Sequence, residues 1–184
     1  VPDAFKQQKK TVLPAGSAST IQSAEPVPAA CPGLKAFNFA RNNKASIQAA
    51  SHTETGNSSA SELQHWPVQL HLINPRATYF NGSNFLLAAD CSAFAAGDFH
   101  QRYLKNKTLA IACPKLDDGR DRYVEKLTIL INEARIDTLT VLKMQVPCCS
   151  GLRALALEAR EKAERHIPIK SITIDPEGIV LEEV

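Results

Sequence analysis

The stretch Thr108-Leu109-Ala110-Ile111-Ala112-Cys113-Pro114 decides the fold of this chain. It is a short, continuously apolar run that stops abruptly at a Cys-Pro pair. Runs of this length, apolar throughout, are typical of strands that are covered on both faces in a parallel sheet. The stretch therefore predicts a buried parallel strand over residues 108–112, with a cysteine directly after it.

Segments of the same kind lie on both sides of this run. Phe85–Ala89 is a short apolar run closed by Asp90-Cys91, and residues 137–146 end at Pro147-Cys148-Cys149. Alternating apolar residues predict a further strand that stops at Asn74-Pro75. The predicted strands are residues 68–73, 85–89, 108–112, 137–146 and 167–174, and a turn at 175–178 leads into the apolar residues 179–181.

Two helices are predicted between these strands. Apolar residues within 123–134 fall on one stripe with helical period, and residues 150 to about 166 are rich in Ala, Leu, Glu and Arg. Asp117 or Asp118 is expected to cap the first helix. Strands alternating with helices form right-handed parallel crossovers. The order predicts an α/β fold with a doubly wound, mostly parallel sheet, a Rossmann-like three-layer arrangement.

The first sixty residues have a different composition. Residues 1–30 mix Ala, Pro, Ser, Gln and Lys without a period, and residues 42–61 are small and polar. Between them lies the turn Cys31-Pro32-Gly33. We predict an irregular N-terminal arm and linker over 1–61, with 42–61 as a surface loop, and an α/β domain over 62–184. The chain begins Val-Pro-Asp without Met, and we interpret it as a fragment in preference to a processed protein.

Composition excludes several function classes. The 184 residues carry a net charge of only +2, with 44% apolar, 22% charged and 6% aromatic residues. There is no dense basic block for nucleic acid or an anionic membrane, and aromatic residues are too scarce for stacking on single strands. No apolar stretch is long enough for a membrane helix. We therefore expect no nucleic-acid partner and no membrane partner.

The cysteine count indicates a reducing compartment. An odd number of cysteines does not suit a secreted disulfide framework, and the adjacent pair would form a strained disulfide. Reduced thiols in a cytoplasmic protein are the simpler interpretation. The five cysteines are Cys31, Cys91, Cys113, Cys148 and Cys149.

These cysteines recur at equivalent places in the predicted fold. Cys91, Cys113 and the Cys148-Cys149 pair each follow a buried strand, and the carboxyl ends of parallel strands line one edge where ligands bind. The arm could bring Cys31 over that edge. A single cysteine at a strand end is usually a small buried apolar residue. Recurrence, together with the prolines beside Cys31 and Cys113, favours ligands that share one pocket.

Several other kinds of site are weighed against this hypothesis. Thiolates select zinc, copper(I) or iron–sulfur clusters, but no histidine stands at zinc-finger spacing. A cysteine nucleophile stays open, although no partner base is singled out. There is no GxGxxG or GxxxxGK[ST] phosphate motif, and Ser150-Gly151 is only a weak anion signal. The histidines are interpreted as surface or packing residues: His52, His65, His71, His100 and His166.

Four runs together resemble a family of bacterial and archaeal ferredoxin-like, 4Fe–4S-binding proteins. They are Trp66–Leu72, Ala88–Cys91, Cys113–Asp118 and Val146–Cys149. The likeness covers roughly residues 62–180 and the Cys31-Pro32-Gly33 turn. Members carry an N-terminal ferredoxin module with two four-cysteine motifs, followed by a domain like this one, whereas this chain has no CxxCxxCxxxC run. The resemblance implies that the partner is a ferredoxin module or a redox partner protein. It gives no information on the oligomeric state.

We therefore expect residues 62–184 to be a cluster-binding domain that holds a 4Fe–4S cluster and transfers electrons. The expected ligands are Cys31, Cys91, Cys113 and one of the adjacent pair. Cys149 is preferred over Cys148, because side chains alternate along a strand and Cys149 lies nearer a helix start. Two alternatives stay open: an enzyme whose cluster has an open iron site for a small ligand, and a zinc-binding or assembly module.

Overall fold

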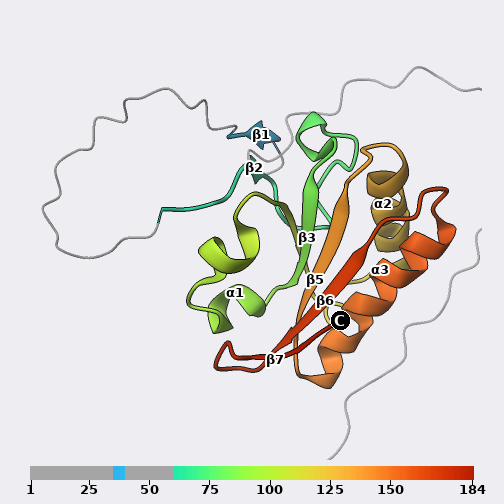
Figure 1. The fold of residues 1–184 in the computed structure, drawn as a ribbon. Coiled ribbons are helices and arrows are strands. Elements are labelled where there is room, and N and C mark those ends of the chain that lie inside the picture. Colours follow the sequence, from blue (N-terminus) through green and yellow to red (C-terminus); the bar gives the residue numbers. More distant parts are fainter. Residues whose placement is uncertain (1–34, 40–59) are drawn as a thin grey trace, which may run out of the picture. The chain divides into compact units, whose positions relative to one another are not determined.

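A five-stranded sheet forms the centre of the part that the computed structural model describes, residues 35–39 and 60–184 (Figure 1). In spatial order its strands are β4 (Thr108–Ala112), β3 (Asn84–Ala89), β5 (Thr138–Met144), β6 (Ile169–Ile174) and β7 (Val180–Glu183). The first four are parallel, and β7 is antiparallel to β6. The mostly parallel sheet and the positions of β3, β4, β5 and β6 agree with the sequence prediction, whereas β7 was expected only as apolar residues after a turn.

Strand β3 is apolar from Phe85 to Ala89 because both faces of the sheet are covered there. Leu86 of β3 pairs with Leu109 of β4 on one side and with Thr140 of β5 on the other. From Phe85 to Ala89 every residue of β3 is buried. A strand in this position has no solvent-facing side, so the alternation expected of a half-exposed strand is absent.

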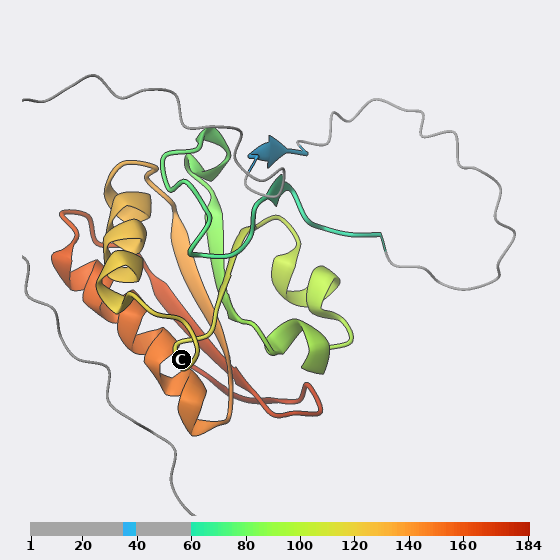
Figure 2. The same cartoon turned by 180° about the vertical axis from the view of Figure 1, so that it is seen from behind.

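Helices form a layer on each side of the sheet, as predicted. Figures 1 and 2 show α2 (Arg120–Asn132) and α3 (Ser150–Lys162) together on one face, and α1 (Ser92–Ala95) with the π-helical turn His100–Leu104 on the other. The chain moves from β3 outward to β4, then crosses back over β3 to β5. Because each crossover is right-handed, this reversal places the two sets of helices on opposite faces.

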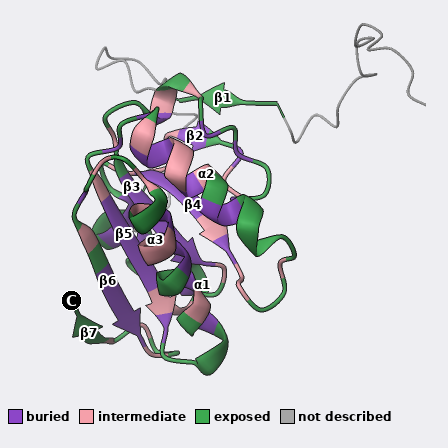
Figure 3. Ribbon diagram, turned by 90° about the vertical axis from the view of Figure 1, so that its right-hand side faces the viewer, coloured by how far each residue is buried: buried purple, intermediate pink, exposed green. Residues whose placement is uncertain are grey.

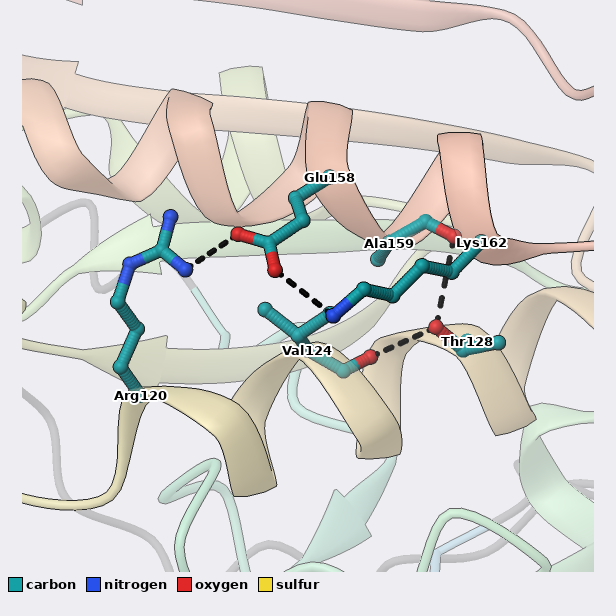
Figure 4. Close-up of polar contacts among 6 residues, drawn as sticks. All are labelled: Arg120, Val124, Thr128, Glu158, Ala159 and Lys162. Carbon is teal, nitrogen blue, oxygen red and sulfur yellow. Dashed lines mark hydrogen bonds and ion pairs between the residues drawn. The ribbon is translucent and has the colours of Figure 1, made fainter.

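The apolar stripe of α2 faces inward, and its outer residues link it to α3. The predicted stripe is buried at Tyr123, Val124, Leu127, Leu130, Ile131 and Ala134, and Figure 3 shows the same division into buried and exposed faces. Figure 4 shows the link: Glu158 of α3 forms ion pairs with Arg120 and, at 2.9 Å, with Lys162. The Thr128 hydroxyl of α2 donates to the Val124 carbonyl of the same helix at 2.8 Å and to the Ala159 carbonyl of α3 at 3.4 Å.

The strand predicted over residues 68–73 is wrong. Only Gln69 forms a bridge, to Ile111 of β4, and the chain then turns. The Gln69 carbonyl accepts the N–H of Ile73 at 3.0 Å, and the Lys126 ammonium donates to three carbonyls of this turn at 2.7–3.0 Å. The alternating pattern arose because apolar residues of the turn enter the core, and such a turn can reproduce the period of a strand.

A short ribbon lies at the amino edge of the sheet, which we define as the starts of β3, β4, β5 and β6. β1 (Phe37–Asn38) pairs with β2 (His65–Trp66), and His65 Nε2 accepts the N–H of Leu109 at 3.0 Å. The rest of the predicted arm and linker, including Cys31 and nearly all of residues 42–61, lies outside the described residues. Within the described ranges, no helix has the length and apolarity needed to cross a bilayer.

Candidate cysteine site

The four described cysteines surround one pocket. Cys91, Cys113, Cys148 and Cys149 line a cavity of about 170 Å³ at the carboxyl edge of the sheet, the edge formed by the residues that directly follow β3, β4 and β5. All four thiols are free. The prediction that the cysteines after these three strands share a pocket is therefore confirmed for the described residues, whereas Cys31 lies outside them.

The pocket lies at the point where the strand order reverses. β4 and β5 flank β3 on opposite sides, and the connections leaving β3 and β4 run in opposite directions across the sheet. In open α/β sheets the crevice beyond the carboxyl ends of the strands at such a reversal is the usual place for a ligand. Cys91 follows β3 and the Cys148-Cys149 pair follows β5, so they border this crevice directly.

Cys91 begins the short helix α1. Its carbonyl accepts the N–H of Phe94 at 3.2 Å and of Ala95 at 3.3 Å. The next residue, Ser92, is fully buried and its hydroxyl donates to the Ala89 carbonyl at 2.6 Å. These bonds fix the backbone around Cys91 while the cysteine itself is exposed. The side chain is thus presented from a rigid turn.

Cys113 is held by the carboxylate of Asp117. Asp117 Oδ2 accepts the backbone N–H of Cys113 and the hydroxyl of Tyr123, each at 2.8 Å. The expectation that Asp117 or Asp118 caps α2 is wrong. The residue before α2 is Gly119 with φ +83°, and no side chain caps the helix there. Asp117 instead closes the cysteine loop that precedes the helix.

The adjacent cysteines lie in a 3-10 turn, Pro147–Cys149, and not in a strand. Side chains therefore do not alternate there, and both Cys148 and Cys149 line the pocket. The reason given for separating them is wrong. Cys148 is exposed and Cys149 is buried. Burial raises the pKa of the Cys149 thiol; a hydrogen bond with the backbone of Met144 opposes this shift, and Cys148 and Cys91 add smaller increases.

Two of the cysteine loops pack directly against each other. A Cβ built on Gly151 would lie 3.1 Å from Cβ of Pro114, the residue after Cys113. Gly151 is the second residue of α3, two positions after Cys149. The glycine therefore allows the two loops to approach closely. Sequence reasoning missed this contact, although a glycine in the first turn of a helix was the available signal.

A polar network borders the pocket, and sequence reasoning did not single it out. Asp90 directly precedes Cys91 and lines the pocket. Its pKa is raised, mainly by burial and secondarily by the nearby Asp117, and its Oδ1 has no hydrogen-bond partner among the described residues. Burial and the bond to Asp117 also raise the pKa of Tyr123, whose hydroxyl lies 3.3 Å from Nδ1 of His71. The signal for Asp90 was its place beside a candidate cysteine.

The rest of the surroundings is apolar. Ala89, Ala112, Met144 and Val146 complete the wall of the pocket. Among residues 35–39 and 60–184, no three side chains of His, Cys, Asp or Glu are grouped so that they could hold a metal ion. The arrangement offers four soft sulfur donors around a small apolar cavity.

Comparisons with known proteins identify the fold family. A protein of Archaeoglobus fulgidus, described as an uncharacterized protein, is 30% identical over 128 residues, which cover 66% of this chain and 89% of that protein. No solved structure matches the chain. The model of a family described as the Rossmann-like domain matches residues 77–184, which contain the whole five-stranded sheet and the described cysteines. This chain therefore belongs to the Rossmann-like domain family.

Proposed function

We propose that residues 62–184 bind a 4Fe–4S cluster through thiols of the cysteine pocket and use it in electron transfer. The observation that carries this proposal is the convergence of Cys91, Cys113, Cys148 and Cys149 on one pocket from three separate loops. A cubane cluster takes four cysteine ligands, and thiolates are the ligands that iron–sulfur clusters prefer. The bound cluster would supply one-electron transfer.

The pocket suits a group larger than a single ion. Its volume of about 170 Å³ is several times the roughly 30 Å³ that one water molecule occupies in the liquid. Apolar residues such as Ala112 and Met144 would exclude water from the cluster and so influence its redox potential. The chain's own residues would therefore hold the cluster, shield it and fix the distance to a partner.

The choice of the fourth ligand, between Cys31 and the second cysteine of the Cys148-Cys149 pair, rests on how far the chain before Phe37 can extend. Phe37 of β1 pairs with Trp66 at the amino edge, and Cys31 precedes it by six residues. Six extended residues span about 20 Å, roughly the length of a six-residue strand such as β3. Cys31 would therefore need nearly its full reach to enter a pocket at the carboxyl edge. We propose Cys91, Cys113, Cys148 and Cys149 as ligands, with Cys31 as the spare thiol.

The proposal includes a partner and a compartment. Phe94 and Leu116 are 92% and 80% exposed, and each stands three residues after a pocket cysteine. Exposed apolar side chains beside a redox site suit a transient protein contact that brings two cofactors close together. A ferredoxin module or another redox partner protein would dock there, and free thiols suit the reducing cytoplasm.

Anaerobic reconstitution of the full chain with iron and sulfide tests the function. The expected product contains iron and sulfide in equal amounts, absorbs visible light and is bleached by dithionite. Stoichiometric zinc without sulfide would contradict the proposal and favour the assembly module. A visible spectrum that changes on addition of a small molecule would favour the enzyme with an open iron site.

Single Cys→Ser variants identify the ligands. Cys91→Ser and Cys113→Ser are expected to lose the cluster, as are the variants at positions 148 and 149, while Cys31→Ser should retain it. Ser171→Ala, a change at a buried residue of β6 away from the pocket, serves as the control. Retention of the cluster in both the Cys91 and Cys113 variants would refute the proposal. Loss in Cys31→Ser with retention in Cys148→Ser would restore Cys31 as a ligand.

A further inference from the structure

A second cavity, distinct from the cysteine pocket, opens on a face of the sheet. It has a volume of about 280 Å³ and lies between the π-helical turn, β5, β6 and β7. Lys107, which lines it, directly precedes β4, whereas Cys113 directly follows that strand. The two sites are therefore at opposite ends of β4. The lining residues are Arg102, Tyr103, Lys107, Thr140, Lys170, Ile172, Val180 and Glu183.

The charges around this cavity are positive in sum. Three cations, Arg102, Lys107 and Lys170, line it against one carboxylate, that of Glu183. Arg102 also pairs, at 3.8 Å, with Asp98, which does not line the cavity. Lys170 Nζ pairs with Glu183 Oε1 at 2.5 Å, whereas the hydrogen bond found for the Lys107 ammonium among the described residues is to the Tyr103 carbonyl, at 3.0 Å. Partial burial, and secondarily the charge of Lys170, lowers the pKa of Lys107. A positive charge is thus held here without a carboxylate of its own.

A buried donor without a partner lies in the same wall. Tyr103 is only 3% exposed, and its hydroxyl has no hydrogen-bond partner among the described residues. A buried hydroxyl left without a partner costs free energy, and such groups in native proteins usually mark a missing ligand, ion or water. Oxyanions accept hydrogen bonds from hydroxyl and ammonium groups together. The unpaired hydroxyl and the lysines therefore favour the same kind of ligand.

We propose that this cavity binds a small organic molecule that carries one oxyanion group, a phosphate ester or a carboxylate. The oxyanion accepts hydrogen bonds from Lys107, Lys170 and the Tyr103 hydroxyl, and it replaces the Glu183 carboxylate as the partner of Lys170. Ile172 and Val180 provide the apolar wall for the body of the molecule. A cavity of about 280 Å³ lies just below the roughly 300–1,000 Å³ that is usual for ligand pockets, which limits the ligand to a small metabolite.

Calorimetric titration of the full chain, with inorganic phosphate in one series and butyrate in another, tests the site. We expect saturable binding of at least one anion, and the tighter of the two identifies the oxyanion class. Lys107→Met and Lys170→Met should each weaken binding about tenfold, since each removes a charge-assisted hydrogen bond. Lys105→Met is the matched control, because Lys105 is exposed and does not line the cavity.

The Glu183→Gln variant gives the most specific result. Removing the competing carboxylate should tighten anion binding about threefold, in keeping with the strength of an exposed ion pair. Tyr103→Phe should weaken binding and leave the far-UV spectrum unchanged. The proposal is overturned if neither anion binds, if Lys107→Met binds as the native chain does, or if Glu183→Gln weakens binding.

Discussion

The two ends of the central sheet satisfy their polar groups differently. At the amino edge, hydroxyls have side-chain partners: Ser83 Oγ lies 2.8 Å from Thr108 Oγ1, and the Thr138 hydroxyl donates to the amide oxygen of Asn84 at 2.8 Å. At the carboxyl edge four thiols are free, and one carboxylate oxygen of Asp90 lacks a partner among the described residues. The paired side chains at the starts of β3, β4 and β5 thus stabilise the fold, while the carboxyl edge keeps donor groups available for a ligand.

The largest effect is expected from a glycine that supports the carboxyl edge. Gly178 has φ +83°, and a Cβ there would lie 2.5 Å from the carbonyl oxygen of Ala95 in α1. Gly178→Ala must displace the β6–β7 turn or the helix that starts beside Cys91. We expect a loss of about 3 kcal/mol or more in the free energy of unfolding, measured by urea titration.

A second glycine provides the control for this substitution. Gly82 also has a positive φ, +62°, but a Cβ there would meet nothing within 4 Å. Gly82→Ala carries only the backbone penalty, about 1 kcal/mol. Equal losses in the two variants would show that the contact between the turn and α1 does not matter, and the contrast between the edges would lose this support.

The amino edge can be tested through pH. Burial lowers the pKa of His65 from 6.5 to about 4, with the backbone of Pro67 opposing the shift. The unfolded chain therefore takes up a proton below about pH 6.5 that the folded chain does not accept until about pH 4. The contribution of His65 to the free energy of unfolding should fall by about 3 kcal/mol as the pH falls across this window, and should stay constant above it.

Two variants isolate this contribution. His65→Gln keeps an acceptor for the Leu109 N–H but cannot titrate, so the difference from the native chain should shrink as the pH falls. His166→Gln changes an exposed histidine and should follow the native curve. Urea unfolding at several pH values measures both. A His65→Gln curve parallel to that of the native chain would show that His65 does not titrate as described.

A smaller effect is expected at the Cys113 loop. In the native chain, Asp117 Oδ2 accepts both the Cys113 N–H and the Tyr123 hydroxyl. Asp117→Asn keeps one acceptor oxygen but removes the negative charge. Losing the charge-assisted bonds should cost about 1–2 kcal/mol in unfolding free energy. Asp118→Asn, at the exposed neighbouring position, should change stability little. The reverse order would restore Asp118 as the structural residue of this loop.

The sequence predicted the strands better than the loops. Thr108–Ala112 was found with its bounds, because a strand buried on both faces must be apolar throughout. The convergence of Cys91, Cys113 and the Cys148-Cys149 pair at the carboxyl edge followed from the predicted parallel strands. The use of Asp117 and Gly151 could not be predicted, because each depends on a contact with another part of the chain. Local patterns favoured a helix cap for Asp117 and gave only a weak anion signal at Ser150-Gly151.

The last prediction uses Gly151 to separate stability from the geometry of the site. Alanine is favoured over glycine within a helix by about 0.5–1 kcal/mol, but its Cβ would lie 3.1 Å from that of Pro114. The gain and the steric cost oppose each other, so the stability of Gly151→Ala should change by less than about 1 kcal/mol.

The two loops must nevertheless move apart by a few tenths of an ångström. Cys113 is adjacent to Pro114, and Cys149 lies two residues before Gly151, so both cysteines would move with the loops. A cluster needs its ligands in a fixed geometry, so iron retained after anaerobic gel filtration should fall in Gly151→Ala although the fold is intact. Gly97→Ala, where a Cβ meets nothing within 4 Å, should keep the native iron content. Full iron content in Gly151→Ala would mean that the pocket tolerates the displacement, and the close packing of the loops would then have no role in holding the cluster.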